Sequence, residues 1–273
     1  MSTIDVALVQ VGYGDEESLV ERVDRVCDWV QRLGRADLVI LPELWAHGGF
    51  ASSTWASSAE TLTGATVGRL TELARDAATW IHAGSIIERA VEGGPRGPLG
   101  RGLWNTSLLL SPTGEIRTTY RKIHRFGFGE GEPQLLEAGE EVAVANLEWD
   151  EGRSVRIGLA TCYDLRFPEL FRSLAERGAE VVALPAAWPM PRVEHWRLLG
   201  QARAIENQTW VLQCNTAGTH SGIEMGGHSR VVAPTGEVLA ELGAGEDVLT
   251  ATLDLDMVDR VRQDFPVLAD RRL

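Results

Sequence analysis

The stretch Ser107-Leu-Leu-Leu-Ser-Pro-Thr-Gly-Glu-Ile116 has a close counterpart late in the chain, Ser229-Arg-Val-Val-Ala-Pro-Thr-Gly-Glu-Val238. Each combines a strand-like apolar run with a Pro-Thr-Gly turn and the start of a second strand. A shorter pair, Val39-Ile-Leu-Pro42 and Val182-Ala-Leu-Pro185, precedes the two stretches in the same order. One such match arises easily by chance, but two in the same order favour two sheets of similar build, packed face to face.

The apolar periodicity of the chain predicts helices between buried strands. A strand at 4–11 is followed by a helix at 16–33, which ends before Gly34, and by a buried strand at 37–41 that Pro42 stops. We expect further helices at 66–78, 168–177, 194–207 and 255–262, and further strands at 80–87, 106–110, 116–120, 142–147, 155–161, 180–184, 210–215, 229–233, 238–242 and 248–253, the last three closing the sheet. This order is typical of an α/β protein in which helices cover largely buried sheets.

The composition favours one soluble, acidic domain. The chain has 273 residues, 44% of them hydrophobic, and no linker or low-complexity run divides it, so we expect a single domain over residues 1–273. The glycine- and proline-rich stretch 93–102 lies between two expected strands and is typical of a surface loop. With 39 acidic and 26 basic residues the net charge is −13, which disfavours nucleic acid and anionic membranes as partners. It leaves room for an anionic substrate, because one arginine can dominate the field of a pocket.

The cysteines and the N-terminus predict a reduced, cytoplasmic protein. Cys27, Cys162 and Cys214 are too widely spaced for a disulfide framework or a zinc cluster. No apolar run approaches the roughly 18 residues that a membrane-spanning helix needs. The first residues enter a strand pattern at once and lack the basic start of a signal peptide.

Three residues of different chemistry each follow an expected strand. Cys162 follows Ile157-Gly-Leu-Ala-Thr161, Glu43 follows Val39-Ile-Leu-Pro42, and Lys122 follows the strand 116–120. Active sites of α/β proteins commonly form at the carboxyl ends of strands, and a helix that begins near residue 168 would favour the thiolate of Cys162. Taken singly, the cysteine fits a buried hydrophobe, the glutamate a structural ion pair and the lysine a surface residue. Together they supply a nucleophile, a base and an electrophile.

Other chemistries find less support in the sequence. His124 and His195 are candidates for a rival Cys–His pair, but neither is flanked by an Asn or Asp that would orient it. The six histidines show no His-x-x-x-His spacing, and no Gly-x-Gly-x-x-Gly follows a strand. The stretch Phe126-Gly-Phe-Gly-Glu-Gly-Glu132 lacks the Gly-Lys-Ser/Thr ending of a phosphate loop. We therefore expect neither a metal nor a cofactor.

The chain resembles the nitrilase (carbon–nitrogen hydrolase) superfamily over essentially its whole length. The resemblance rests on three separated motifs in the right order: Leu41-Pro-Glu-Leu-Trp45, Tyr120-Arg-Lys-Ile-His124 with Gly129-Glu-Gly-Glu132, and Thr161-Cys-Tyr-Asp-Leu-Arg-Phe-Pro-Glu-Leu170. It implies a four-layer α-β-β-α sandwich and a homodimer or higher homo-oligomer, with the dimer formed through the helices 168–177 and 194–207 and added contacts from the C-terminal tail.

The resemblance also implies a catalytic triad of Glu43, Lys122 and Cys162. Glu130 falls on the second glutamate of the family and is expected to position Lys122 or the substrate. Glu43 would take the thiol proton while Cys162 attacks an amide carbon. Lys122 and the backbone N–H of Tyr163 would hold the oxyanion, and water would then hydrolyse the thioester.

The substrate class comes from a finer resemblance. The blocks Cys162-Tyr-Asp-Leu-Arg-Phe-Pro168, Ala187-Trp-Pro189 and Ala202-Arg-Ala-Ile-Glu-Asn-Gln208 are most similar to the omega-amidase branch. That branch cleaves the terminal amide of 2-oxo dicarboxylic acid monoamides such as 2-oxoglutaramate. The small-molecule substrate would then carry a carboxylate, for which Arg166 is the candidate ligand unless it pairs with Asp164 or Glu169.

Several alternatives stay open at this point. Trp45, Phe128 and Trp188 are candidates for the pocket wall, although each also fits a core position. Deaminated-glutathione amidases and N-carbamoyl amino acid hydrolases share the triad. A true nitrilase has Trp-Glu after the cysteine, where this chain has Tyr163-Asp164. Outside the superfamily's enzymes, a non-catalytic interaction protein on the same scaffold is the main rival, and it has no need of the intact Glu–Lys–Cys set.

Overall fold

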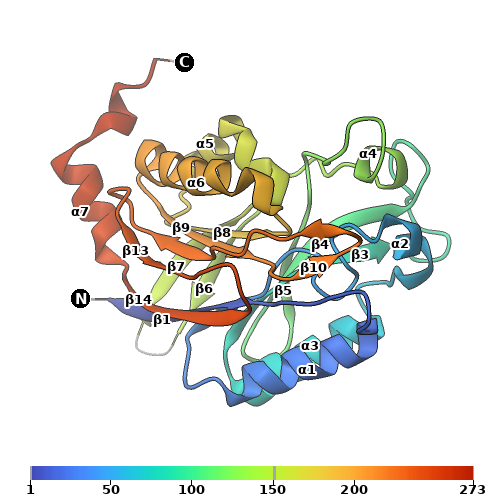
Figure 1. Cartoon of the computed structure of the whole chain (residues 1–273). Coiled ribbons are helices and arrows are strands. Elements are labelled where there is room, and N and C mark those ends of the chain that lie inside the picture. Colours follow the sequence, from blue (N-terminus) through green and yellow to red (C-terminus); the bar gives the residue numbers. More distant parts are fainter. Residues whose placement is uncertain (1, 150–151, 273) are drawn as a thin grey trace.

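Two six-stranded sheets pack face to face, with helices on both outer faces (Figure 1). The computed structural model describes residues 2–149 and 152–272. The first sheet has the order β14-β1-β2-β3-β4-β5, with β1 (Thr3–Gln10), β2 (Leu38–Ile40), β3 (Trp80–Arg89), β4 (Leu103–Leu110), β5 (Ile116–Arg121) and β14 (Asp247–Asp254). The second has the order β13-β12-β9-β8-β7-β6, with β6 (Val144–Glu148), β7 (Ser154–Leu159), β8 (Val181–Ala186), β9 (Trp210–Asn215), β12 (Arg230–Val232) and β13 (Val238–Glu241). The four-layer α-β-β-α sandwich is therefore confirmed.

The two sheets have the same internal build. In the first, the parallel strands β1, β2 and β3 lie between antiparallel β14 and the β4–β5 hairpin. In the second, parallel β7, β8 and β9 lie between antiparallel β6 and the β12–β13 hairpin. Both sequence echoes fall on equivalent strands, since β4–β5 matches β12–β13 and β2 matches β8. The expected pair of similar sheets is confirmed.

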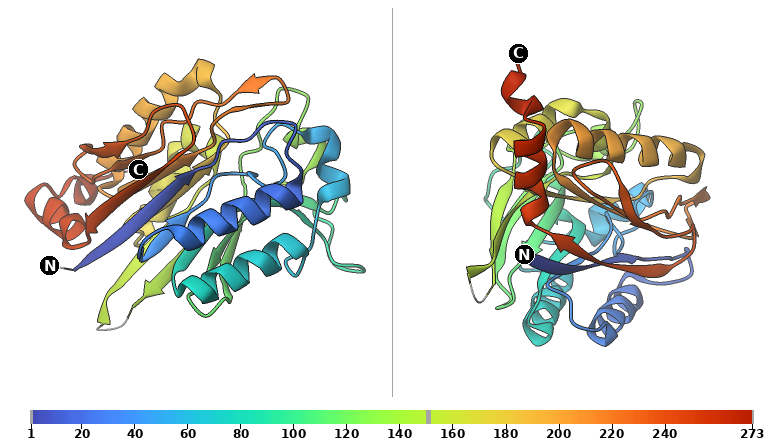
Figure 2. Two further views of the ribbon diagram at one scale, coloured as in Figure 1. Left: turned by 60° about the horizontal axis from the view of Figure 1, so that its bottom comes forward. Right: turned by 90° about the vertical axis from the view of Figure 1, so that its left-hand side faces the viewer.

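The last strand differs from the expectation. We expected 248–253 to close the same sheet as the two strands before it, but β14 pairs antiparallel with β1, from Thr3 opposite Asp254 to Gln10 opposite Asp247. The chain thus returns to the first sheet at its end, and both views of Figure 2 show this red strand beside the blue one. A local pattern of apolar residues identifies a strand but does not say which neighbour it pairs with.

Helices cover the outer face of each sheet. Figures 1 and 2 show α1 (Leu19–Arg32) and α3 (Ala65–Ala77) against the first sheet, α5 (Pro168–Glu176) and α6 (Val193–Asn207) against the second, and α7 (Asp256–Asp264) after β14. α1 begins at a capping box in which Ser18 and Glu21 bond each other's backbone N–H. None of the helices within 2–149 and 152–272 is long and apolar enough to cross a membrane. Short elements escaped prediction: α2 (Ser52–Ser58), α4 (Glu132–Leu135), η2 (Cys162–Arg166), η3 (Met190–Arg192), η4 (Val267–Asp270), β10 (Thr219–His220) and β11 (Ile223–Glu224).

The core has two layers because alternate residues of β1 point to opposite faces. Val6 and Leu8 belong to the cluster between the two sheets, whereas Ala7 and Val9 pack with α1 and α3. All four are buried, and burying an aliphatic side chain contributes roughly 1.5–3 kcal/mol. This packing on both faces of one strand fixes the sheets against each other, and with them the positions of the strand ends.

Gly84 lets β3 approach the loop that begins at Pro42. Its backbone has a φ of +69°, and a Cβ atom there would lie 1.8 Å from the carbonyl oxygen of Pro42. Only glycine fits, because any side chain would both clash with this backbone and disfavour the positive φ. The residue after Pro42 is Glu43, so the close approach also sets where that carboxylate emerges.

The substitution Gly84→Ala is expected to lower the free energy of unfolding by about 3 kcal/mol or more, since a backbone clash adds to the strain of a positive φ. Gly93→Ala is the matched control. Gly93 has a φ of +73°, but a Cβ atom there would meet no other atom within 4 Å, so the substitution should cost only about 1–2 kcal/mol. Urea denaturation followed by circular dichroism measures both, and equal losses would contradict the role given to the Pro42 contact.

Candidate active site

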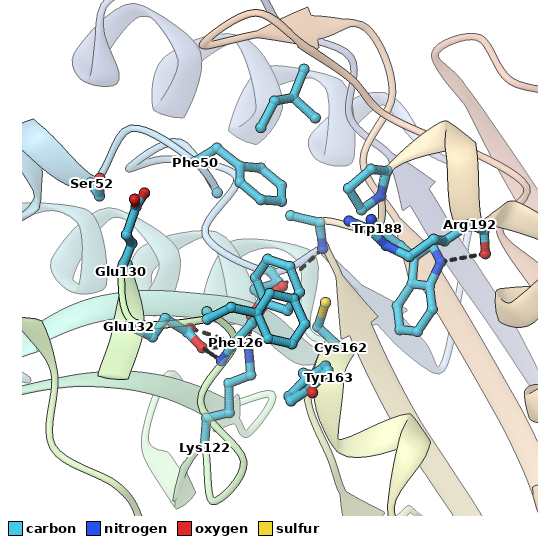
Figure 3. Close-up of a pocket in the computed structure, with 18 of the residues that line it drawn as sticks. Phe50, Ser52, Lys122, Phe126, Glu130, Glu132, Cys162, Tyr163, Trp188 and Arg192 are labelled. Carbon is cyan, nitrogen blue, oxygen red and sulfur yellow. Dashed lines mark hydrogen bonds and ion pairs between the residues drawn. The ribbon is translucent and has the colours of Figure 1, made fainter. Parts of the chain in front are cut away.

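Cys162 lies at a sharp turn of the backbone, shortly after β7 ends at Leu159. It is the first residue of the 3-10 helix η2 and has a φ of +47°, which non-glycine residues rarely adopt. Asp164 accepts a bond from the Thr161 backbone N–H at 2.8 Å, which ties the turn together. The thiol of Cys162 lines a cavity of about 600 Å³, within the size range of small-ligand pockets (Figure 3).

Lys122 lies between two buried carboxylates at the floor of this cavity. Its Nζ is 2.8 Å from Oε1 of Glu43 and 3.0 Å from Oε2 of Glu132. The amide of Asn105, on β4, donates to Oε1 of Glu43 at 2.8 Å and to Oε1 of Glu132 at 2.7 Å. In Figure 3, Glu132 lies to the left of Cys162, and the side chain of Lys122 extends upward toward Glu132 from below. The structure thus brings together the three residues of the expected triad and adds two that were not expected.

Glu43 also connects the two sheets. Its Oε2 accepts a hydrogen bond from the backbone N–H of Ala187 at 2.9 Å, in the segment that follows β8. Glu43 itself follows β2, the equivalent strand of the first sheet. The carboxylate is therefore held from both halves of the sandwich.

Burial raises the pKa of the Cys162 thiol well above its usual range, and the negative charge of Glu43 raises it further. The charge of Lys122 and a hydrogen bond from the Ala187 N–H act in the opposite direction but do not outweigh these effects. This direction favours the protonated thiol in the resting site and opposes the thiolate that the following helix was expected to favour. Proton transfer to a base must therefore accompany attack.

The two partners of the thiol have shifted pKa values too. Burial by itself lowers the pKa of Lys122, but the charges of Glu132 and Glu43 outweigh burial and raise it well above its usual range. Burial raises the pKa of Glu132, against the lowering effect of Lys122. Lys122 is therefore a permanent cation at neutral pH, and Glu132 binds a proton more readily than an ordinary carboxylate does.

The neighbour of Lys122 is Glu132, not Glu130. Glu130 is exposed on the cavity wall, and Figure 3 places it away from Lys122, near Ser52. Gly127, Gly129 and Gly131 all have positive φ values, so the loop reverses direction repeatedly before α4 begins at Glu132. In Gly129-Glu-Gly-Glu132 the sequence cannot show which carboxylate turns inward, and the alternative that Glu130 positions Lys122 was wrong. The other alternative, that Glu130 positions the substrate, stays a prediction, since Glu130 lines the cavity.

Asp164 ties the Lys122 segment to the Cys162 segment. It accepts bonds from the Tyr120 hydroxyl at 2.7 Å and from the His124 backbone N–H at 3.0 Å, two residues on either side of Lys122. The same carboxylate holds the Thr161 N–H beside Cys162. Since Asp164 is fully buried, these bonds lie in a medium of low polarity, where they fix geometry strongly.

The candidate pocket residues divide into two groups. Arg166, Trp188 and Phe128 line the cavity, as does Tyr163. Trp45 does not line it: its side chain is buried among the residues under α1 and α3, with its indole N–H bonded to the Ala83 carbonyl at 3.0 Å. The prediction of Trp45 in the pocket wall was wrong because the chain turns at Leu44, whose φ is +45°.

Arg166 has no carboxylate partner among residues 2–149 and 152–272. Its guanidinium lies 4.8 Å from the ring centre of Trp188, and both of its terminal nitrogens are 3.4 Å from Nδ1 of His195. Neither expected structural pair, with Asp164 or with Glu169, is formed. Sequence inspection missed a second arginine at the cavity, Arg192, at the end of η3.

The rival histidine candidates have other partners in the structure. Of the rival candidates, His124 bonds Asp164 through Nδ1 at 2.7 Å and stacks on Phe167, while His195 contacts Arg166. We expected no orienting partner for His124, and this expectation was wrong because Asp164 bonds it. No histidine of the described chain lines the cavity with Cys162. The described ranges also hold no group of three or more His, Cys, Asp or Glu side chains placed to bind a metal ion.

Comparison with known proteins agrees with this geometry. The family model described as carbon-nitrogen hydrolase matches residues 5–263. A 2-oxoglutaramate amidase of Paenarthrobacter nicotinovorans is 46% identical, over 98% of this chain and 90% of that protein. A carbon–nitrogen hydrolase superfamily protein of Xanthomonas campestris, with an arsenic adduct in its active site, is 30% identical and superimposes with a TM-score of 0.87, over 100% of this chain and 98% of that one.

A third similar protein bears on the nucleophile. The amidase of Nesterenkonia sp. AN1, in the structure of a mutant with one glutamate replaced by glutamine, is 27% identical, with a TM-score of 0.78 over 97% of this chain and 99% of that one. That structure shows the result of Michael addition of acrylamide at the active-site cysteine.

The raised pKa of Cys162 predicts that the resting thiol stays protonated between pH 6 and 9. A group whose pKa is raised loses its proton only at higher pH, so no thiolate absorbance near 240 nm should appear in this range when the spectrum of Cys162→Ser is subtracted from that of the native protein. Cys27→Ser is the control, because burial raises the pKa of Cys27 to about 11. A thiolate step below pH 8 that only Cys162→Ser removes would contradict the assignment of a neutral thiol.

Proposed function

The chain belongs to the carbon–nitrogen hydrolase family, and on that basis we propose that it is an omega-amidase, which releases ammonia from the terminal amide of 2-oxo dicarboxylic acid monoamides such as 2-oxoglutaramate. The observation that carries the proposal is the presence of Arg166, free of any described carboxylate partner, in the same cavity as Cys162, Glu43 and Lys122. The name of the relative that is 46% identical supports the same substrate.

In the proposed mechanism Glu43 is the general base, and its Oε2 is the atom that acts. Each carboxylate oxygen has two lone pairs. Both lone pairs of Oε1 are used, by Lys122 and Asn105, whereas Oε2 accepts only the Ala187 N–H among the described groups. Oε2 therefore has a lone pair left for the proton of the Cys162 thiol.

The chemical steps follow from this arrangement. As the proton passes to Glu43, sulfur bonds to the amide carbon and the carbonyl electrons move to oxygen. Lys122 and the backbone N–H of Tyr163 stabilise that oxyanion, and a preorganised donor of this kind contributes about 3 kcal/mol. Collapse of the intermediate breaks the C–N bond, and ammonia leaves with the proton from Glu43. Water, deprotonated by Glu43, then attacks the thioester and releases the acid and the thiol.

The cavity suits a short substrate with one carboxylate. A guanidinium has five N–H donors and binds a carboxylate through two parallel N–H bonds; the long contacts with His195 leave Arg166 donors for this. Trp188 and Phe128 add apolar surface that would cover the methylene groups of the substrate. The net charge of −13 does not oppose such an anion, because the local cations lie far closer to it than most surface carboxylates.

We also propose that the protein forms a homodimer through α5 and α6. Leu198 and Ile205 are 68% and 53% exposed and lie seven residues apart on α6, hence on one face of the helix. Beyond α7, Phe265 and Val267 are exposed as well. Burying these side chains against a second copy would remove apolar surface from water.

Ammonia release from a panel of amides tests the proposed activity. We expect 2-oxoglutaramate to give the highest kcat/KM, ahead of glutamine, deaminated glutathione and N-carbamoyl amino acids, and Cys162→Ala to lose at least about 10⁴-fold because the thioester cannot form. Cys27→Ala, which removes a buried thiol outside the cavity, is the control. A carbamoyl substrate as the best one would overturn the omega-amidase assignment, and native-rate ammonia release by Cys162→Ala would overturn the mechanism.

The two glutamates of the glycine-rich loop are expected to differ sharply. Glu132→Gln should lower kcat/KM by roughly 100-fold, because Lys122 would then pair with Glu43 alone and make that base weaker. Glu130→Gln, two residues away on the exposed wall, should change it less than about threefold. Thermal melts establish that each variant is folded, and Glu132→Asp replaces Glu132→Gln if the latter is not. Equal effects of the two substitutions would contradict the assignment of Glu132 as the partner of Lys122.

A further inference from the structure

Arg192 is a second cationic group of the cavity and also lacks a carboxylate partner in the described parts of the chain. It is the last residue of η3, and its guanidinium lies 5.7 Å from the ring centre of Phe126, which lines the same cavity. Three carboxylates line this space, those of Glu43, Glu130 and Glu132, and two of them are committed to Lys122. Arg192 therefore brings to the cavity a positive charge that is not paired with any described carboxylate.

Trp188 contacts both of these arginines, the side chain of Arg166 and the backbone of Arg192. Its indole N–H donates to the backbone carbonyl of Arg192 at 2.7 Å, and the guanidinium of Arg166 lies 4.8 Å from its ring centre. Figure 3 shows Arg192 beside Trp188, on the far side of Cys162 from Glu130. The wall around Trp188 thus carries two positive charges, while Glu130, the lining carboxylate that is not bonded to Lys122, lies on the opposite wall.

Two positively charged side chains that line one cavity favour a ligand with more than one acceptor group. A guanidinium has only donors and a fixed charge, so it accepts no proton and repels an ammonium group. Beside its carboxylate, a 2-oxo acid has a carbonyl oxygen that accepts a hydrogen bond. At the same carbon a 2-amino acid such as glutamine carries an ammonium group, which meets the arginine with a like charge.

We propose that Arg192 determines specificity at carbon 2 of the substrate: it donates to the 2-oxo oxygen and excludes the 2-ammonium group, while Arg166 binds the carboxylate. This inference rests on the proposed omega-amidase function and names how that site distinguishes a 2-oxo acid from the corresponding amino acid. Arg192 acts through binding and takes no part in proton transfer, which Glu43 performs.

Three amides that differ only at carbon 2 test the inference: 2-oxoglutaramate, glutaric acid monoamide and glutamine, which carry an oxo group, two hydrogens and an ammonium group there. In Arg192→Gln we expect the KM for 2-oxoglutaramate to rise at least tenfold with kcat within threefold, and the KM for glutaric acid monoamide to stay within threefold. The preference for 2-oxoglutaramate over glutamine should fall at least tenfold. Arg192→Lys, which keeps the charge, should retain most of the discrimination against glutamine.

Two further variants separate this role from a general loss of positive charge. Arg166→Gln should raise the KM for all three amides alike, and Arg117→Gln, which removes an exposed arginine on β5, should change none of them. Equal losses on all three amides in Arg192→Gln, or none, would overturn the inference while leaving the omega-amidase activity in place. A native protein that does not hydrolyse 2-oxoglutaramate would instead overturn the proposed function itself.

Discussion

The ammonium of Lys122 is buried between the carboxylates of Glu43 and Glu132, and the rest of the site depends on this arrangement. A buried ion costs several kcal/mol in lost hydration, which attraction repays only when its partners are close and bonded in turn. Asn105 meets that condition by donating to both carboxylates. Burial is the main cause of the raised pKa of Glu132 and of the Cys162 thiol, and the negative charge of Glu43 raises both further. The cluster thus places a base, Glu43, beside a protonated nucleophile, the thiol of Cys162.

The doubled sheet is what assembles this cluster. Glu43 and Lys122 follow strands of the first sheet, whereas Cys162 follows β7 of the second, so the nucleophile and its base meet only when the sheets pack face to face. Polar bonds cross the same boundary: Ser107 on β4 lies 3.0 Å from the Thr161 hydroxyl, and the Ala187 N–H holds Glu43. Because two packed sheets resist small shifts, the distances between these groups are set by the fold rather than by flexible loops.

Sequence patterns predicted correctly those features of the fold that depend only on residues close together in the chain. Continuous apolar runs located the strands, and the polar residues at their ends located Glu43, Lys122 and Cys162. What failed depended on long-range pairing or on backbone reversals: β14 joined the first sheet, the positive φ of Leu44 turned Trp45 into the core, and three positive-φ glycines turned Glu132 rather than Glu130 inward. In the sequence, Asn105 is only weakly indicated as a site residue, by being an amide within an apolar strand. Nothing in the sequence indicates Arg192, because its role depends on Trp188 and Phe126.

The chain as a whole is negatively charged, whereas Arg166 and Arg192 bring positive charge to its cavity. The charge within the cavity determines which ligand binds there. A net charge of −13 is spread over a surface where salt screens it within about 10 Å. Inside the cavity the two arginines lie close to the space that a ligand would fill, so each charge acts on it over a short distance. Arg166 and Arg192 therefore attract the carboxylate end of an anionic amide to one wall. The amide end of the same molecule then faces Cys162. The same asymmetry that admits a 2-oxo acid makes the site unfavourable for its amino counterpart.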